Sequence, residues 1–168
     1  GNRKPAPLAA GGRLYMQGLN RIIAVDDHNG TILWALELPE TQRFNIPRDT
    51  SNWCADEDHV FVAGPRLLVI DGRTGALLRT QTVPGVHADS DDHEWGYVAR
   101  TDELMLGSTV RKGSSHTGWW GAEHWYDGRD NFSILKVCSD TLFATEPDSG
   151  SLRWEYQPDG LIINPTIT

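Results

Sequence analysis

Short apolar runs, broken every few residues by glycine and acidic residues, set the pattern of hydrophobic and polar positions in this chain. The runs at residues 22–25 and 67–70 are rich in β-branched side chains and have the length of single strands. An alternating run follows at residues 31–36 and places Ile32 and Trp34 on one face. No window keeps a helical apolar pattern for more than about two turns. The pattern therefore predicts an all-β chain built from hairpins.

A turn signal lies between paired runs and occurs three times, in residues 24–34, 69–79 and 144–154. Each copy has an acidic residue, a glycine four positions later and a large side chain four positions after the glycine. The carboxylate can accept backbone N–H bonds in the turn, and glycine adopts the positive φ that other residues avoid. We interpret these positions as structural. They are Asp26, Gly30 and Trp34, then Asp71, Gly75 and Arg79, then Glu146, Gly150 and Trp154.

A second pair of short strands precedes each turn unit, for instance at residues 8–10 and 14–16. Asp26 and Asp71 are 45 positions apart, and four strands in a period of roughly 40–45 residues are typical of a β-propeller blade. We therefore predict one partial propeller domain over residues 1–168, an arc of about three and a half four-stranded antiparallel blades. Its parts are blade one at 7–40, blade two at 48–84, blade three at 94–157 with a loop insertion at 107–131, and the start of blade four at 160–168.

The repeated pattern Ala-x-Asp-x-x-Thr-Gly-x-x-x-Trp resembles the repeat of pyrroloquinoline-quinone (PQQ) propellers. Such repeats occur in quinoprotein dehydrogenases and in non-enzymatic propellers of the outer-membrane assembly lipoprotein class. The resemblance covers residues 7–168 and implies that Trp34 and Trp154 dock between neighbouring blades. Blade two departs from the pattern with Arg79 at the tryptophan position, and blade three has Glu146 for aspartate. The resemblance also implies a periplasmic or cell-envelope location.

An arc of blades leaves two flanks uncovered, whereas propellers of about 4–8 blades close on themselves and remove their edges. We therefore expect this chain to be a fragment of a longer protein whose remaining blades complete the ring. The first residues lack the apolar segment of a signal peptide, so the expected location depends on the resemblance alone. No apolar run reaches the roughly 18 residues of a membrane span, and none is predicted.

Charge and cysteine content argue against two classes of function. The net charge is −8 and no cluster of Lys and Arg stands out, so the basic footprint of nucleic-acid binding is missing. Cys54 and Cys138 are 84 positions apart and form no CxxC motif, which leaves a zinc or dithiol redox motif without support. We interpret them as two buried strand thiols, with one long-range disulfide as the alternative.

The irregular segments join the second strand of a blade to the third, or one blade to the next, and in a propeller such segments open on one rim. Residues 87–94, in the link before blade three, hold seven potential ligands. Carboxylates suit Ca²⁺, and histidine with carboxylate suits Zn²⁺ or another transition metal. A solvated acidic loop is the alternative. The candidate metal ligands are His87, Asp89, Asp92, His93 and Glu94.

Two further segments of this rim offer ligand contacts. The insertion is rich in tryptophan beside carboxylate and histidine, which can stack on a flat ligand ring or pack on the neighbouring blade. The link before blade two offers an arginine and an aspartate that either hold a carboxylated ligand or pair with each other. The candidate ligand-binding residues are Arg48, Asp49, Asn52, Trp119, Trp120, Glu123, His124 and Trp125.

Three functions are compatible with these features. The first is a non-catalytic binding or scaffold propeller whose loop-rich rim contacts a protein partner or a small ligand. The second is a PQQ-dependent quinoprotein oxidoreductase, for which the resemblance implies PQQ held between a tryptophan and a disulfide of adjacent cysteines, with Ca²⁺ bound by Glu and Asn. Adjacent cysteines are absent from this sequence. The third is a carbohydrate-binding propeller, suggested by the tryptophan-rich insertion. We assign no catalytic residue.

Overall fold

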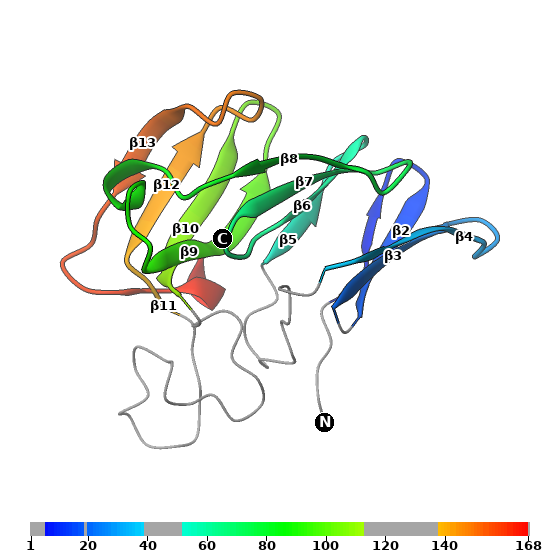
Figure 1. Ribbon diagram of the computed structural model, residues 1–168, viewed down its shortest axis with the longest axis horizontal. Helices are drawn as coiled ribbons and strands as arrows, with labels where there is room; N and C mark the ends of the chain where they lie inside the picture. The colour runs from blue at the N-terminus through cyan, green and yellow to red at the C-terminus, as the bar shows by residue number, and fades with distance from the viewer. Residues whose placement is uncertain (1–5, 19, 39–51, 113–137, 168) are drawn as a thin grey trace, which may run out of the picture.

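The computed structural model describes residues 6–18, 20–38, 52–112 and 138–167, and its elements are nearly all β-strands (Figure 1). Three four-stranded antiparallel sheets follow one another along the chain. Among the described residues, no helix has the length and apolar character that crossing a bilayer requires. The prediction of an all-β partial propeller with four-stranded antiparallel blades is confirmed.

We name the sheets blade one, blade two and blade three in chain order. Blade one contains β1 (Leu8–Ala10), β2 (Arg13–Gly18), β3 (Arg21–Asp26) and β4 (Ile32–Glu37). Blade two contains β5 (Trp53–Ala55), β6 (His59–Val62), β7 (Leu67–Asp71) and β8 (Leu77–Gln81). Blade three contains β9 (His93–Arg100), β10 (Met105–Arg111), β12 (Thr141–Thr145) and β13 (Leu152–Tyr156). The remaining elements are the 3₁₀ helices η1 (Gly85–His87) and η3 (Asn164–Thr166), and the strand pair β11 (Cys138–Ser139) and β14 (Ile162–Ile163).

The last two strands have the same register in all three blades. The residue at the tryptophan position of the repeat pairs with the residue ten positions before it, next to a β-bulge. The sequence repeat is therefore also a repeat of backbone geometry. The pairs are Ala24–Trp34, Val69–Arg79 and Ala144–Trp154.

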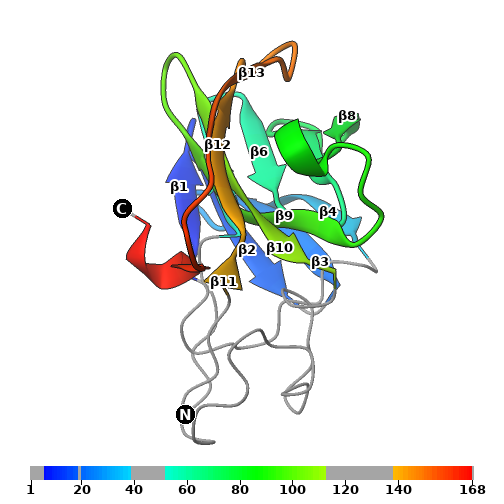
Figure 2. The same cartoon turned by 90° about the vertical axis from the view of Figure 1, so that its left-hand side faces the viewer.

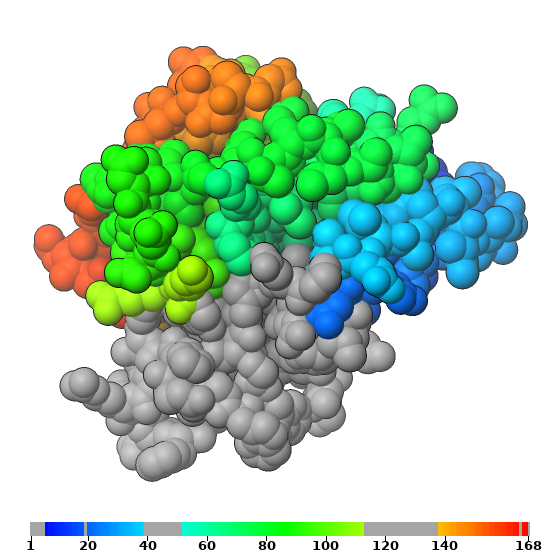
Figure 3. Space-filling view, in the orientation of Figure 1, coloured from blue at the N-terminus to red at the C-terminus, as the bar shows by residue number. Residues whose placement is uncertain are grey.

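Apolar side chains pack between adjacent blades, which stand in an arc with their faces turned toward one another (Figures 1 and 2). Figure 3 shows the same succession on the surface, from the blue residues of blade one to the orange residues of blade three. The cluster between blades one and two contains Tyr15, Ile22, Ala24, Trp34, Trp53, Val60, Val62 and Ile70. The cluster between blades two and three contains Phe61, Ala63, Leu67, Val69, Val83, Trp95, Val98, Met105 and Phe143.

The three repeated turns have the conformation that their sequence predicts. The N–H of each turn glycine donates at 2.9 Å to the carbonyl oxygen of the acidic residue four positions earlier. The glycines Gly30, Gly75 and Gly150 have φ values of 74°, 75° and 70°. Gly75 has a second reason to lack a side chain, because a Cβ there would lie 2.7 Å from the ring of Trp34.

The Asp71 turn makes part of the folding free energy depend on pH. The backbone N–H and hydroxyl of Thr74, together with the N–H of Arg73, bond to the carboxylate and hold the pKa of Asp71 below its usual value. Because the folded-state pKa is the lower one, this stabilisation is complete above about pH 4 and is lost as the pH falls through the folded-state pKa. We expect Asp71→Asn to lower the urea midpoint at neutral pH and to approach the unmodified protein in acid. Urea unfolding of both proteins from neutral pH into acid measures the difference between their midpoints. A difference that does not change with pH would contradict the prediction.

An equivalent hydrogen bond crosses each of the two interfaces between blades, from the tryptophan position to the turn of the next blade. Nε1 of Trp34 donates to the carbonyl oxygen of Gly72 at 2.9 Å. Nη2 of Arg79 donates to the carbonyl oxygen of Pro147 at 2.6 Å. Gly72 and Pro147 each directly follow the acidic residue of their turn. Arg79 thus makes, by a different side chain, the contact that tryptophan makes in blade one.

Trp154 occupies the same position in blade three, but no further blade covers it in the described part of the chain. Its exposed fraction is 41%, compared with 9% for Trp34. Tyr156 lies on the same face of β13 as Trp154 and is 56% exposed. Blade three therefore presents an apolar outer face at the position where blade one is covered by blade two.

The loop insertion in blade three begins later than the sequence predicts. Strand β10 continues to Arg111, so Gly107 lies inside a strand and not at the start of a loop. A Cβ at Gly107 would lie 2.4 Å from the ring of Trp95 and 2.5 Å from that of Phe143. The start at residue 107 is wrong because this glycine makes room for two aromatic rings; it does not mark a turn.

The segment predicted to start blade four forms a short strand among the described residues, and its assignment to a fourth blade stays a prediction. An apolar β-branched run does form strand β14, but Ile163 of this strand pairs with Cys138 of β11, and a 3₁₀ helix follows. Strands β11 and β14 thus form a separate two-stranded sheet next to the chain that leads into β12. The outer limits of the blades stay predictions.

Both cysteines are free thiols on strands, as the first interpretation predicts. Burial, followed by the charge of Asp56, raises the pKa of Cys54 to about 12. Since the thiolate is the reactive form, only about one Cys54 in 10⁴ is ionised near pH 8. We expect iodoacetamide to modify Cys54 very slowly in the folded protein and rapidly in urea. Mass spectrometry of the labelled peptides measures this, and rapid labelling of the folded chain would contradict it.

Candidate metal centre and the cavity beside it

Strand direction sorts the connections into two edges of the arc. The β1–β2 and β3–β4 connections and their counterparts form one edge, the turn edge. The β2–β3 connection and its counterparts, with the links between blades, form the opposite edge, the link edge. Strands β4 and β10 both end at the link edge, and β5 begins there (Figure 1). Antiparallel order alone thus directs the irregular connections to one edge.

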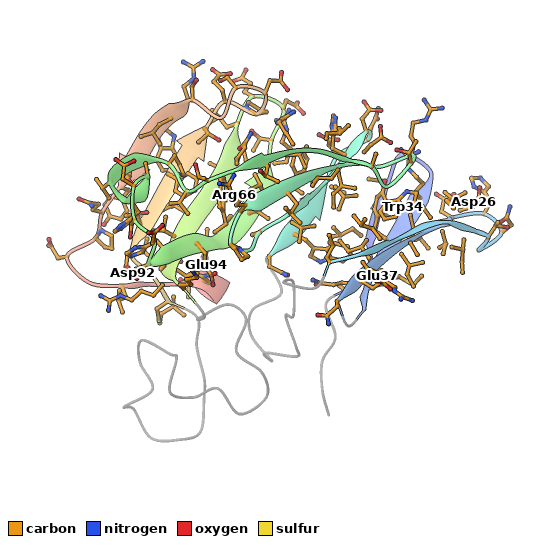
Figure 4. All side chains as sticks on the ribbon, viewed as in Figure 1. Asp26, Trp34, Glu37, Arg66, Asp92 and Glu94 are labelled. Carbon is orange, nitrogen blue, oxygen red and sulfur yellow. The ribbon has the colours of Figure 1, made fainter. Side chains whose placement is uncertain are left out.

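A cavity of about 250 Å³ opens on the link edge between blade two and blade three. The link of residues 82–92 forms much of its wall, and Arg66 of the β6–β7 connection lies on the opposite side. Glu94 and Lys112 also line it. Figure 4 shows Arg66 on blade two and Asp92 and Glu94 beside blade three. Charged side chains of both signs therefore surround the cavity.

His93 is fixed by hydrogen bonds at both ring nitrogens. Nε2 lies 2.8 Å from Oδ2 of Asp140, and Nδ1 lies 2.8 Å from Oγ of Ser90. His93 begins β9 opposite Arg111 of β10, while the N–H of Asp140 donates to the carbonyl oxygen of Thr109 on β10. Strand β10 thus positions histidine and aspartate from its two sides, although they are 47 positions apart in the sequence.

His87 completes the group from the other side of the link. Its ring stacks on that of His93 with a centroid distance of 3.7 Å. His87 is the last residue of helix η1, which is tied to blade three because the N–H of Val86 donates to both carboxylate oxygens of Glu155 at 3.2 Å. Burial and the neighbouring His93 lower the pKa of His87. Ligand atoms of His87, His93 and Asp140 all lie within 4.8 Å of one another.

Residues 2–110 match the family model described as outer membrane protein assembly factor BamB, a PQQ-repeat family. The match covers more than half of the chain. The chain belongs to this family. The resemblance inferred from the turn repeat is therefore confirmed. A comparison with curated proteins gives no match.

Solved propeller structures are similar to the chain in fold. A europium-containing methanol dehydrogenase is 20% identical with a TM-score of 0.58, over 92% of this chain and 32% of that one. A quinohemoprotein alcohol dehydrogenase from Comamonas testosteroni is 13% identical with a TM-score of 0.55, over 92% of this chain and 21% of that one. The chain therefore spans a third or less of these proteins, and the likeness establishes the propeller fold.

Sequence reasoning found part of the histidine cluster. The structure brings His87 and His93 together, while Asp89 and Glu94 line the cavity without joining the group. Asp92 lies in the link, where its carbonyl oxygen accepts the N–H of Lys112, and it is also outside the group. Asp140 was not predicted, because only the pairing of β10 with β12 brings it to the histidines. An aspartate directly before a strand that pairs with β10 was the available signal.

Most of the predicted ligand-binding residues lie outside the described residues. Asn52 is the described one, and it is fully buried at the start of β5. Its carbonyl oxygen accepts the N–H of Ala63 at 2.7 Å, but neither polar atom of its side-chain amide has a partner in the described part of the chain. The residues outside are Arg48, Asp49, Trp119, Trp120, Glu123, His124 and Trp125.

The described residues do not fit the PQQ site that quinoprotein propellers imply. Cys54 and Cys138 are separate free thiols, so the disulfide of adjacent cysteines is not formed in this chain. Asn52, with its unpaired amide, and the buried Glu94 have the right residue types for Ca²⁺. Two such residues do not make a quinone site, and we derive no step through the cofactor.

Proposed function

We propose that the chain is part of a non-catalytic binding scaffold in the cell envelope and that its link edge contacts a partner protein. The observation that carries the proposal is membership of the family described as outer membrane protein assembly factor BamB. That description implies a role in protein assembly and a location at the outer membrane, on its periplasmic side. A small ligand on the same edge is the related alternative.

The two edges of the arc differ in a way that supports the link edge as the contact surface. The turn edge repeats one hydrogen-bonded turn three times and uses its side chains for that purpose. On the link edge, the irregular link of residues 82–92 exposes Val86 at 57%, whereas the apolar residues exposed beside the turn edge, such as Ile32 at 65%, belong to regular strands. Exposed Asp89 and Asp91 lie a few residues away. Apolar and charged side chains exposed together on an irregular segment suit a protein interface.

Site-directed photo-crosslinking in envelope preparations tests this proposal. A photoreactive residue at Asp91 on the link edge should cross-link to a component of the outer membrane protein assembly machinery. The same residue at the equally exposed Asn29 on the turn edge is the matched control and should give no such product. Equal yields at the two positions, or no assembly component at Asp91, would count against the proposal.

A PQQ-dependent oxidoreductase is the second candidate, and the one observation that favours it is the buried amide of Asn52, which has no hydrogen-bond partner among the described residues. Addition of PQQ with Ca²⁺ should then give a chromophore that an alcohol reduces, and Asn52→Ala should abolish it. Under the scaffold proposal, no reducible chromophore forms. Carbohydrate binding depends on the insertion, which lies outside the described residues, and stays a prediction.

A further inference from the structure

We propose that His87, His93 and Asp140 bind one divalent transition-metal ion of the Zn²⁺ type at the wall of the link-edge cavity. Two imidazoles and one carboxylate are the donor set that proteins use for such ions, in contrast to the all-oxygen sets of Ca²⁺ and Mg²⁺. The proposal is independent of the scaffold function. The three residues come from the link before blade three and from two separate segments of blade three.

The distances between the three side chains are close to those that one ion requires. Ligand atoms bound at roughly 2.0–2.2 Å to the same ion lie no more than about 4.4 Å apart. The ligand atoms here lie within 4.8 Å of one another. A small movement of His87 closes the remaining difference, because His87 is the last residue of the short 3₁₀ helix η1 in the link, whereas His93 and Asp140 are each held by β10.

Ser90 supplies the outer hydrogen bond that a metal-binding histidine needs. An ion on Nε2 of His93 leaves a proton on Nδ1, and Oγ of Ser90 lies 2.8 Å from that nitrogen. The hydroxyl oxygen also accepts the N–H of Asp92 at 3.2 Å, which fixes its position. Such an acceptor sets the tautomer and the ring orientation of the ligand. His93 thus has one nitrogen for the ion and a partner for the other.

Three protein ligands leave a coordination position open toward the cavity. His87 and His93 both line that cavity, so a fourth ligand would enter from its interior. Arg66 and Lys112 line this cavity together with the carboxylates of Asp89, Asp91 and Glu94. With charges of both signs present, a water molecule or an anionic group such as a carboxylate can serve as that fourth ligand. In a protein interface, an acidic side chain of the partner has this chemistry.

A second group of potential ligands provides an internal control. Asp26, Asp27 and His28 are consecutive on the turn edge, and two of the three are exposed. Oδ1 of Asp26 already accepts the N–H groups of His28 and Asn29, because it closes the repeated turn. Nδ1 of His28 already contacts Oδ1 of Asp27 within the group, and none of the three residues lines the link-edge cavity. We therefore expect no specific ion there.

Titration with Co²⁺ tests the site in the full chain after treatment with a chelator. We expect one Co²⁺ per chain, the visible absorption of a four- or five-coordinate ion, and displacement by Zn²⁺ but not by Ca²⁺. Ser90→Ala should weaken binding about 10-fold, and His87→Ala should weaken it by more. His28→Ala should bind as the unmodified protein does.

Two results would overturn the proposal: equal affinity in the His87→Ala and unmodified proteins, or loss of binding on His28→Ala. Circular dichroism confirms that each variant is folded. If His87→Ala fails to fold, the histidine ¹⁵N shifts of the unmodified protein on Zn²⁺ addition decide the question. Movement of His87 and His93 together supports the site. Unchanged shifts leave Ser90, His93 and Asp140 as a purely structural hydrogen-bonded chain and contradict it.

Discussion

Replacement of Trp34 by alanine should lower the free energy of unfolding by about 3–5 kcal/mol. The indole is 9% exposed, fills the space between blades one and two, and donates to the carbonyl oxygen of Gly72. Its ring also lies against Gly75 and 5.9 Å from the ring of Tyr15. The substitution leaves a cavity at the interface and removes the shorter of two hydrogen bonds to the Gly72 carbonyl, which Tyr15 also contacts at 3.2 Å. Urea unfolding followed by tryptophan-independent circular dichroism measures the loss.

Trp154→Ala is the matched control for this prediction, since Trp154 has the same register in blade three. Its exposed fraction of 41% means that alanine removes far less buried surface. We expect a loss of less than about 1 kcal/mol, as is usual for substitutions away from buried contacts. If the two variants lose the same free energy, the indole of Trp34 does not hold two blades together.

Replacement of Gly107 by alanine should cost about 2–3 kcal/mol, although it adds one methyl group. The new Cβ would lie 2.4 Å from the ring of Trp95 and 2.5 Å from that of Phe143. These rings pack edge to face at 4.8 Å and are fully buried, so neither can move without displacing the core between blades two and three. Overpacking therefore outweighs the usual gain of alanine over glycine.

Gly160→Ala is the control for this effect, because nothing lies within 4 Å of a Cβ at that position. We expect it to be neutral or slightly stabilising, through the reduced freedom of the unfolded chain. Thermal unfolding of the two variants gives the comparison. A Gly107→Ala variant as stable as Gly160→Ala would mean that Trp95 and Phe143 do not meet over β10.

The blades were predictable from sequence because their information is local. Each turn needs an acidic residue, a glycine four positions later and strands on both sides, and all of these lie within about a dozen residues. Three copies, at Asp26, Asp71 and Glu146, make the pattern stand out. The period then gives four-stranded blades, and the strand order gives the two edges.

The candidate metal centre was only partly predictable because its third member is distant in sequence. His87 and His93 belong to one link and stand out together. Asp140 joins them only through the pairing of β10 with β12 across the insertion. Ser90 was a member of the same link, but its role depends on which ring nitrogen of His93 faces it. The strand register in the structure shows that these residues meet, whereas their spacing in the sequence does not.

Arg79 shows why the pattern understated the similarity between the blades. The sequence marks it as a departure from tryptophan, yet its guanidinium reaches the carbonyl oxygen of Pro147 in the next turn. The interface requires a long side chain with an N–H donor at its end, which both arginine and tryptophan provide. A repeat pattern that requires tryptophan therefore misses arginine, which makes the same contact between blades.

If blades are joined by a donor at the tryptophan position that bonds to the next turn, the indole N–H of Trp34 is protected from hydrogen exchange, and NMR measures this protection. Trp34→Phe and Trp154→Phe assign the two indole signals in the spectrum. We expect the Trp34 N–H to exchange only when the blades separate, so that it is strongly protected, while the Trp154 N–H exchanges rapidly. A Trp34 N–H that exchanges as fast as that of Trp154 would show that its bond to Gly72 does not hold the two blades together.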